Sequence, residues 1–279
     1  MKKISRRSFL AAAGLSVAAL ALTACGGSSA STASSVASSA ASSEAASTSA
    51  AAGGLTTVEA GKLTMATNAA FPPYEMTTDA GEFEGIDIET AQAIADKLGL
   101  ELQIDDMDFD AALLSVQQGK ADIVMAGVTV TDERKAVMDF SDSYATGIQS
   151  IIVPEGSDIA SPDDLAGKKI GTQRGTTGYI YCSDDFGDDN VVAYDDGLTA
   201  VQALNNGQVD AVVIDNAPAK EFVAANPGLV ILDTSYAEED YAIGMAKGSS
   251  LEDAVNAALE ELKADGTLQS IVDKYITAE

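Results

Sequence analysis

The chain has 279 residues, with 16 lysines and arginines against 43 acidic residues and a formal net charge of −27 at pH 7. This balance argues against nucleic acid or an anionic membrane surface as a partner of the folded part. Histidine is absent and only two cysteines occur. The usual zinc-binding clusters are therefore excluded, and we expect neither a metal nor a cofactor.

The first 25 residues have the composition of a bacterial export signal. Basic residues precede an apolar run over residues 9–22, and the sequence Leu-Thr-Ala-Cys closes it at Cys25. This ending resembles the bacterial lipobox, which implies that Cys25 is acylated, begins the mature protein and anchors it to the cell membrane. The alternative is an ordinary cleavage site with a chance cysteine. Because Arg6 and Arg7 resemble a twin-arginine signal, Sec and Tat export both remain open.

Residues 26–61 consist almost wholly of serine, alanine, glycine and threonine. Such a segment buries too little apolar surface to offset its ordering entropy, so we expect a flexible linker. No second apolar stretch is long enough to span a bilayer. If Cys25 is acylated, Cys182 has no disulfide partner, and we expect it to be a buried or inert thiol.

The folded part is predicted to begin with an apolar strand at Leu63 that breaks at Asn68. Pro72 and Pro73 then predict an extended loop. Further strands and helices alternate after it, because helical spacing of apolar residues with a glycine stop is followed each time by an apolar run. In chain order we predict helix 89–98, strand 100–104, a loop with Phe109, helix 110–118 and strand 121–125.

A cation occupies an unusual position after that strand. The chain passes Gly127 and Thr129 to a helix start at Thr131, which is typical of an N-cap. Arg134 lies in the first turn, where the helix dipole disfavours a positive charge. Beyond the leader the chain has only Arg134 and Arg174 as arginines, and the planar guanidinium can hold a carboxylate through two hydrogen bonds. A ligand-binding arginine is thus weighed against an ordinary helix-surface arginine.

The chain contains an internal repeat. Residues 113–127 and 200–215 share the order helix, glycine, short turn, aspartate and strand, with Asp122 three residues after Gly119 and Asp210 three after Gly207. Two similar α/β halves explain this pattern. Alternating strands and helices imply parallel strands flanked by helices in each half.

The second half opens with a predicted strand over residues 169–172, a turn rich in glycine and threonine, and a helix. Backbone N–H groups at Thr176 and Thr177 could face an anion there, although an ordinary tight turn is the alternative. The turn is not a Walker loop, because the Gly-Lys-Ser/Thr ending is missing. C-terminal helices over residues 251–262 and 268–275 are expected to serve packing.

Polar and aromatic residues gather at the predicted strand ends. Open α/β sheets bind ligands beyond the carboxyl ends of their strands, and each half supplies two such ends, so we expect a cleft between the halves. A zwitterion that leaves water needs both charges paired. Arg134 and Asp215, from opposite halves, can pair them. The alternative for Asp215 is a helix N-cap.

From about residue 63 to residue 276 the chain resembles the family 3 extracellular solute-binding proteins, the receptors of polar amino-acid ABC importers. The resemblance rests on NAAFPPYE, GIDIETAQAIADKLG, MDFDAAL, GKADIVMAGVTVTDERKAVMDFSDSY, DLAGKKIGTQRGTTG and VDAVVIDNAPA. It implies an α/β, two-lobed fold of the type II periplasmic-binding-protein kind and a monomeric, non-catalytic receptor. Such a receptor closes on an amino acid and delivers it to ABC permease subunits.

The resemblance also implies the division of the chain. We expect residues 62–145 and 241–279 to form lobe 1 and residues 146–240 to form lobe 2. The chain then crosses between the lobes twice, near residues 144–149 and 235–241, and the two crossings make a hinge.

Individual roles follow from the same resemblance. Arg134 is expected to clamp the ligand α-carboxylate with Thr129 and the backbone around Thr177, and Asp215 to take the α-ammonium group with the Gly127 carbonyl and the Thr129 hydroxyl. Phe71 and Phe109 are expected to be aromatic walls. The predicted ligand-binding residues are Asn68, Phe71, Phe109, Gly127, Thr129, Arg134, Gln173, Thr177 and Asp215.

Asn68 stands where the family most often has an aspartate. An amide cannot neutralise a cationic side chain, whereas Arg174 and its turn could favour a carboxylate or amide. We therefore expect a polar neutral or acidic amino acid over a cationic one.

Two other classes of function compete with a receptor. Some relatives of the family are cyclohexadienyl dehydratases, whose chemistry needs a positioned general acid. Glu75 and Glu84 are the spare carboxylates near the motifs, and we expect both to be solvated loop residues. A sensory module is the third class, although we expect no transmembrane or signalling segment after Glu279.

Overall fold

A computed structural model describes residues 49–50 and 55–276 of the chain. The predicted signal segment, Cys25 and most of the predicted linker lie outside the described residues. Residues 56–61, expected in the linker, belong to the fold: β1 (Ser49–Ala50) pairs with β2 (Thr56–Thr57), and the side chain of Thr57 is buried.

Lobe 1 is built on a five-stranded sheet with the order β7, β3, β8, β16, β9. Strand β3 pairs in parallel with β7 and with the central strand β8, while β16 pairs antiparallel with β8 and β9. The antiparallel strands are a departure from the predicted all-parallel half. The bounds are β3 Lys62–Thr67, β7 Glu101–Asp106, β8 Ile123–Val124, β9 Met138–Phe140 and β16 Gly244–Ala246.

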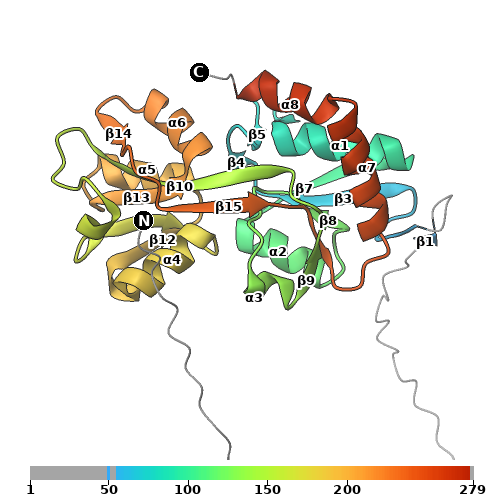
Figure 1. Ribbon diagram of the computed structural model, residues 1–279, viewed down its shortest axis with the longest axis horizontal. Helices are drawn as coiled ribbons and strands as arrows, with labels where there is room; N and C mark the ends of the chain where they lie inside the picture. The colour runs from blue at the N-terminus through green and yellow to red at the C-terminus, as the bar shows by residue number, and fades with distance from the viewer. Residues whose placement is uncertain (1–48, 51–54, 277–279) are drawn as a thin grey trace, which may run out of the picture. The chain divides into compact units, whose positions relative to one another are not determined.

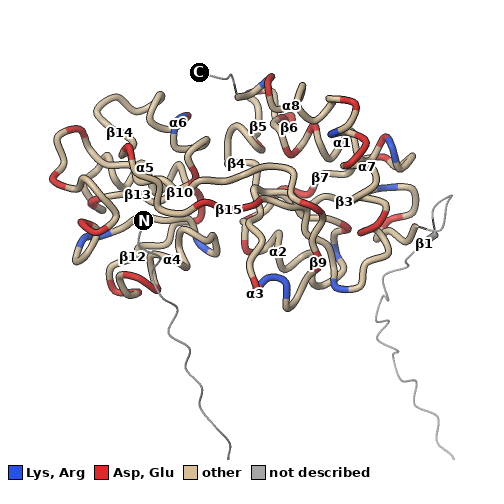
Figure 2. Tube along the Cα trace, in the orientation of Figure 1, with Lys and Arg blue, Asp and Glu red and all other residues tan. Residues whose placement is uncertain are grey.

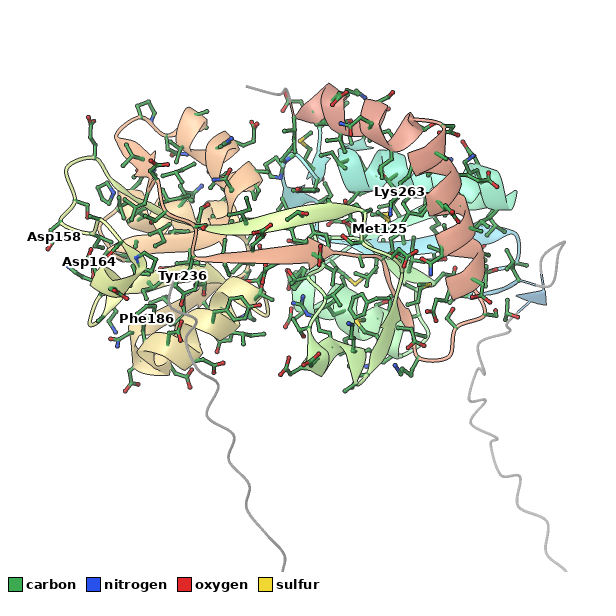
Figure 3. All side chains as sticks on the ribbon, viewed as in Figure 1. Met125, Asp158, Asp164, Phe186, Tyr236 and Lys263 are labelled. Carbon is green, nitrogen blue, oxygen red and sulfur yellow. The ribbon has the colours of Figure 1, made fainter. Side chains whose placement is uncertain are left out.

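Helices cover both faces of this sheet. Alternate residues of a strand point to opposite faces. Met65 therefore packs with α1 (Ile86–Leu98), whereas its neighbour Ala66 packs with α2 (Phe109–Gln117). On the α1 side lie α7 (Glu252–Ala264) and α8 (Thr267–Tyr275), as Figure 1 shows. Figure 3 shows Met125 in the interior of this lobe.

Lobe 2 has a six-stranded sheet in which β12, β11, β13, β10 and β14 follow in order and β15 also pairs with β10. Strand β11 is parallel to β12 and β13, and β10 is antiparallel to its neighbours. The strand bounds are β10 Ala145–Pro154, β11 Ile170–Gln173, β12 Val191–Tyr194, β13 Ala211–Asp215, β14 Leu229–Ile231 and β15 Ala237–Tyr241. The helices are α4 Thr177–Phe186, α5 Gly197–Asn205 and α6 Asn216–Ala225, with short 3₁₀ turns at Pro162–Leu165 and Asp188–Asn190.

Cys182 on α4 is fully buried, as expected, and burial raises the pKa of its thiol to about 12. It packs in the part of the core that also holds Phe186 and Tyr236, whose rings lie 6.4 Å apart between centroids (Figure 3). Acidic positions are spread along both lobes (Figure 2), in keeping with the negative net charge.

Two strands run between the lobes (Figure 1). β10 begins at Ala145 beside Tyr241, the last residue of β15, and its other half pairs with β13 and β14 inside lobe 2. Tyr241 in turn bridges to Thr129 of lobe 1. Because β10 and β15 are hydrogen-bonded to each other, the connection between the lobes is a two-stranded ribbon.

The two-lobed α/β fold is confirmed, but several local predictions are wrong. Helix α1 begins at Ile86 rather than residue 89, and Phe109 is the first residue of α2 rather than a loop residue. The segment after Asn68 is a tight hairpin of β4 (Ala70–Phe71) and β5 (Glu75–Thr77), extended by β6 (Phe83–Glu84), instead of an extended loop. The hairpin closes because the Tyr74 N–H donates to the Phe71 carbonyl.

Candidate ligand-binding cleft

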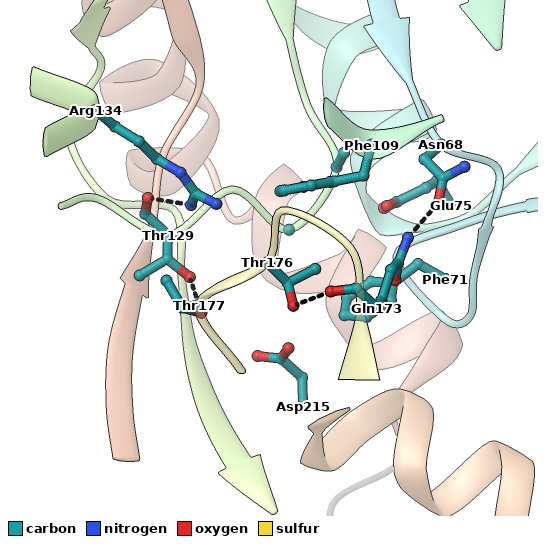
Figure 4. A pocket seen from close by; sticks show the side chains of 12 residues that line it. Asn68, Phe71, Glu75, Phe109, Thr129, Arg134, Gln173, Thr176, Thr177 and Asp215 are labelled. Atoms are coloured by element: carbon teal, nitrogen blue, oxygen red, sulfur yellow. Dashed lines mark hydrogen bonds between the residues drawn. The ribbon is translucent and has the colours of Figure 1, made fainter. Parts of the chain in front are cut away.

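One pocket lies where the strand ends of the two lobes meet, and the lobes leave a cavity of only about 10 Å³ there. All nine predicted ligand-binding residues line it, together with Glu75, Ala126 and Thr176 (Figure 4). The pocket therefore brings together the residues that the motifs placed far apart in the chain. Their roles toward a ligand stay predictions.

Arg134 is buried, with only 8% of its surface exposed. It belongs to the short helix α3 (Asp132–Lys135), whose N-cap Thr131 accepts a hydrogen bond from the Arg134 N–H. The guanidinium donates to the Thr129 carbonyl at 2.7 Å and, across the cleft, to the Gly175 carbonyl at 3.1 Å. Its carbon lies 5.3 Å from the centre of the Phe109 ring. A surface arginine is thereby ruled out, and the cation faces the pocket.

Asp215 supplies the opposite charge from the end of β13. Although it precedes α6, its carboxylate makes no capping hydrogen bond to that helix, so the N-cap alternative fails. Instead one oxygen accepts from the Gln149 amide at 2.8 Å and the other from the Tyr241 hydroxyl. Burial raises the pKa of Asp215 to about 7, against these two hydrogen bonds.

Gly147 explains how Tyr241 reaches Asp215. A Cβ atom at this position of β10 would lie 2.4 Å from the Tyr241 ring, closer than any real contact. Only glycine therefore lets the ring cross the hinge strand and direct its hydroxyl at the carboxylate.

Gly127 is required for a similar reason at the floor of the pocket. Its φ is +55°, a left-handed conformation that favours glycine, and a Cβ atom would lie 2.9 Å from the Phe71 ring. Its N–H donates to the buried carboxylate of Asp87 at 2.9 Å. Asp87 and the Phe71 ring thus fix the backbone of Gly127, whose carbonyl the prediction assigns to the ammonium site.

The amides of Asn68 and Gln173, with the Phe71 ring beside them, form the far end of the pocket from Arg134, and Phe109 lies between the two ends (Figure 4). Gln173 of lobe 2 donates to the Asn68 side-chain oxygen of lobe 1 at 2.8 Å, while the Asn68 amide donates to the Met107 carbonyl at 2.9 Å. Phe71 and Phe109 are both buried, with 6% and 5% of their surfaces exposed. The lobes therefore touch at this end through a direct amide pair.

Glu75 also lines this pocket, and the expectation of a solvated loop residue is wrong for it. Its side chain is fully buried, and neither carboxyl oxygen has a hydrogen-bond partner among the described residues. Burial, and after it the charge of Asp87, hold the pKa of Glu75 well above its ordinary range. Glu75 lies on β5, and the pairing of β5 with β4 directs its carboxyl inward. The local sequence does not reveal this pairing. Glu84, by contrast, is exposed.

Arg174 lies outside the pocket, contrary to the role it was given in ligand choice. Its side chain is 52% exposed and lies 3.5 Å from the Asp195 carboxylate. Gln173, the last residue of β11, directs its side chain into the pocket, and successive residues along a strand direction alternate in side, so Arg174 next to it faces away.

The sequence reasoning missed a buried acid on the hinge ribbon. Glu239 of β15 is 7% exposed and accepts hydrogen bonds from the Thr129 hydroxyl, the Thr177 hydroxyl and the Gln149 amide, each at 3.0 Å. It stands in the acidic run AEEDY, which resembles an exposed surface. Residues two apart in a strand face the same side of the sheet. Because Glu239 lies two residues before the apolar Tyr241, this spacing could have predicted that Glu239 faces inward.

The model of the bacterial extracellular solute-binding proteins, family 3, matches residues 63–278. The chain belongs to this family. The L-cystine-binding protein TcyJ of Escherichia coli is 33% identical over 79% of the chain and 85% of TcyJ. The arginine-binding extracellular protein ArtP of Bacillus subtilis is 33% identical over 78% of the chain and 87% of ArtP.

Solved structures of the family have the same fold. An ancestral arginine-binding protein bound to arginine superposes with a TM-score of 0.74 at 43% identity, covering 77% of this chain and 98% of the other. The form bound to glutamine gives 0.75 at 42% identity, covering 79% and 100%. As a member of this solute-binding family, the chain has the two-lobed type II fold that its motifs predicted.

Neither a membrane helix nor a metal cluster stands out in residues 49–50 and 55–276. No helix there combines the length and apolar character needed to cross a bilayer, and no group of three potential ligand side chains gathers around a common point.

Proposed function

We propose that this family 3 solute-binding protein is the extracytoplasmic receptor of an ABC importer and binds one amino acid between its lobes. The observation that carries the proposal is a buried cation, Arg134, and a buried anion, Asp215, from opposite lobes in one pocket. An α-amino acid has the complementary pair of charges, and each needs a partner once water is expelled. The relatives that bind cystine or arginine support this ligand class.

The far end of the pocket supports a ligand side chain that donates hydrogen bonds. Glu75 offers a buried carboxyl there, beside the amides of Asn68 and Gln173, and a cationic ligand side chain would favour its ionised form, which only accepts hydrogen bonds. Arg174 lies outside the pocket, so it cannot pair with the carboxylate of an acidic ligand side chain, and the argument for an acidic ligand no longer holds. We now infer arginine as the first candidate and glutamine as its neutral counterpart, the two amino acids found in the ancestral relative.

A thermal-shift screen of the common amino acids on the mature protein tests this proposal. A ligand at about 100 times its Kd should add about 2.7 kcal/mol to the free energy of unfolding. We expect arginine or glutamine to give the largest shift and glutamate little. Glu75→Gln should reduce the preference for arginine over glutamine, and a tightest ligand with an acidic side chain would contradict the assignment of this end.

Closure is the proposed signal to the permease. A ligand held by Arg134 of lobe 1 gains hydrogen bonds from Asp215 and the 175–177 turn only when the lobes meet, so binding should shift the population toward the closed form. Small-angle scattering with and without saturating ligand measures this shift. We expect compaction, and unchanged scattering at saturation would oppose a closing receptor.

We further propose that the protein acts as a monomer held at the membrane by lipid on Cys25, where it meets the permease subunits. One acyl chain anchors only marginally, whereas the several chains of bacterial lipoproteins hold firmly. Cys25→Ser should release the protein from the membrane fraction. Retention of the variant in that fraction would defeat the lipid-anchor proposal.

The dehydratase alternative has one observation in its favour, because Glu75 is a buried carboxyl whose pKa is raised by burial, and a general acid requires a group of this kind. We propose no catalytic role, since the relatives named above are binding proteins. Incubation with a cyclohexadienyl substrate should yield no aromatic product by absorbance. Turnover that Glu75→Gln abolishes would reverse this choice.

A further inference from the structure

Glu239 connects three parts of the molecule through a single oxygen atom. Its Oε2 accepts from Thr129 of lobe 1, from Thr177 of lobe 2 and from Gln149 of β10, each at 3.0 Å. The two threonine hydroxyls lie 3.5 Å apart and both belong to residues that line the pocket. A carboxylate of the hinge ribbon therefore controls two hydroxyls of the candidate ligand site.

The direction of these hydrogen bonds is fixed by chemistry. An ionised carboxylate can only accept, and a hydroxyl has one proton to donate. Once Thr129 and Thr177 have each given that proton to Glu239, their oxygens have only lone pairs left for the pocket. Toward a ligand, both hydroxyls are acceptors.

The neighbouring groups have the same polarity. The Gln149 amide uses both of its protons, one on Asp215 at 2.8 Å and one on Glu239. The second oxygen of Asp215 accepts from Tyr241. This part of the pocket thus presents acceptors only, whereas the donors lie on Arg134 and at the N-terminus of α4, where the N–H of Thr177 begins the helix.

We propose that Glu239 determines the orientation of the bound amino acid. By taking the hydroxyl protons of Thr129 and Thr177, it makes this side of the cleft a site for an ammonium group and leaves the α-carboxylate to Arg134. Glu239 acts through the two threonines and is a positioning residue. The inference rests on the proposed function and adds to it the residue that sets the polarity of the site.

The test compares an amino acid with the same molecule lacking its α-ammonium group. Arginine and its deaminated analogue form the first pair of probes, and glutamine with its deaminated analogue forms the second. Calorimetry gives the ratio of affinities within each pair for the full mature protein. In Glu239→Ala the hydroxyls regain their protons, so the ratio should fall by about tenfold or more. The affinity for the deaminated probe should stay the same or increase.

Glu239→Met keeps most of the volume of the side chain but has no oxygen to take the hydroxyl protons, and it replaces Glu239→Ala in the test, with the same expected result, if the smaller variant fails to fold. Glu238→Ala is the matched control, because Glu238 is the exposed neighbour on the same strand, and its ratio should equal that of the wild type. A purely structural role for Glu239 would weaken both members of a pair equally, and this unchanged ratio would overturn the proposal. If the wild type binds no amino acid at all, the proposed function itself falls, and this inference falls with it.

Discussion

Lobe 1 and lobe 2 each contain a helix, a glycine turn and a strand of closely similar geometry. The turn glycines have nearly identical left-handed backbones, with φ of +66° at Gly119 and +67° at Gly207. After each glycine the next N–H bonds back to the helix at 2.9 Å, from Lys120 in lobe 1 and from Gln208 in lobe 2. The similarity of the two sequences is therefore a similarity of backbone.

The aspartates of the repeat perform the same structural task in both lobes. Asp122 accepts from the backbone N–H of Thr64, at the start of β3, and from that of Val58, both at 2.7 Å. Asp210 accepts from the N–H of Lys169, just before β11, at 2.7 Å. Each carboxylate fastens its own strand to the neighbouring one.

The two units differ where their strands end. After β8 the chain runs through Gly127 and Thr129 before it reaches the buried cation of Arg134, while β13 ends directly on the buried anion of Asp215. The same scaffold thus delivers opposite charges to one pocket. We infer that the repeated residues maintain the fold and that the strand ends select the ligand.

The largest expected effect comes from removing either charge at the strand ends. Truncating one partner of a buried charge pair typically costs about 2 to 5 kcal/mol. Arg134→Ala and Asp215→Ala should therefore each weaken amino-acid binding by at least about tenfold. Calorimetry measures the affinity, and circular dichroism should show an unchanged fold.

Arg174→Ala is the matched control for the first of these variants. It removes the other arginine of the lobes from a position 52% exposed and outside the pocket. We expect affinity within about twofold of wild type, because surface ion pairs contribute little. Equal losses in Arg134→Ala and Arg174→Ala would show that the buried position is not what matters.

Stability should respond to the repeated aspartates instead. Asp122 is buried and holds two backbone N–H groups, so Asp122→Ala should lower the free energy of unfolding by about 1.5 to 3 kcal/mol. Asp210 is exposed and holds one, so Asp210→Ala should cost about 1 kcal/mol. Urea denaturation gives both values. A loss of ligand affinity without a loss of stability in either variant would break the distinction between scaffold and strand end.

The residues that could be predicted from the sequence share one property. Arg134, Asp215 and Thr129 lie where a strand pattern stops, so the topology alone brings them to one edge, and all three line the pocket. The two α/β halves and the cleft between them likewise follow from local periodicity and from the rule that strand ends meet. The type II fold was implied only by the resemblance of the motifs to the solute-binding family.

The remaining residues depend on contacts that no local pattern encodes. Glu239 faces inward only because β15 pairs with β10, and Glu75 only because the hairpin after Phe71 is tight. Arg174 faces outward because Gln173 takes the inward position. In each case the sequence shows the charge of the residue, but strand pairing determines whether its side chain points into the pocket or toward solvent.

The anionic strand end should also make binding depend on pH. Burial raises the pKa of Asp215 to about 7, and only the ionised form can pair with an ammonium group. Ligand binding therefore favours loss of the proton, and affinity should fall as pH decreases. For an amino acid with an uncharged side chain, the fall should approach about tenfold per pH unit below about pH 7. Calorimetry from pH 8 to pH 5.5 gives the change in affinity with pH. An affinity that does not change over this range would show that Asp215 does not titrate there.

The smallest expected effect tests whether the two turns are equivalent. Gly119 and Gly207 have left-handed φ angles, and an added Cβ would meet nothing within 4 Å at either position. Gly119→Ala and Gly207→Ala should therefore each lower stability by the cost of the left-handed backbone alone, about 1 kcal/mol, and leave ligand affinity unchanged. Gly127→Ala has the same kind of φ, but its Cβ would press on Phe71 in the pocket, so this variant should lose affinity as well as stability. Urea denaturation measures the stability of the two turn variants, and unequal losses would mean that the two turns contribute differently to stability although their sequences repeat. Unchanged affinity in Gly127→Ala would show that this glycine is not part of the ligand site.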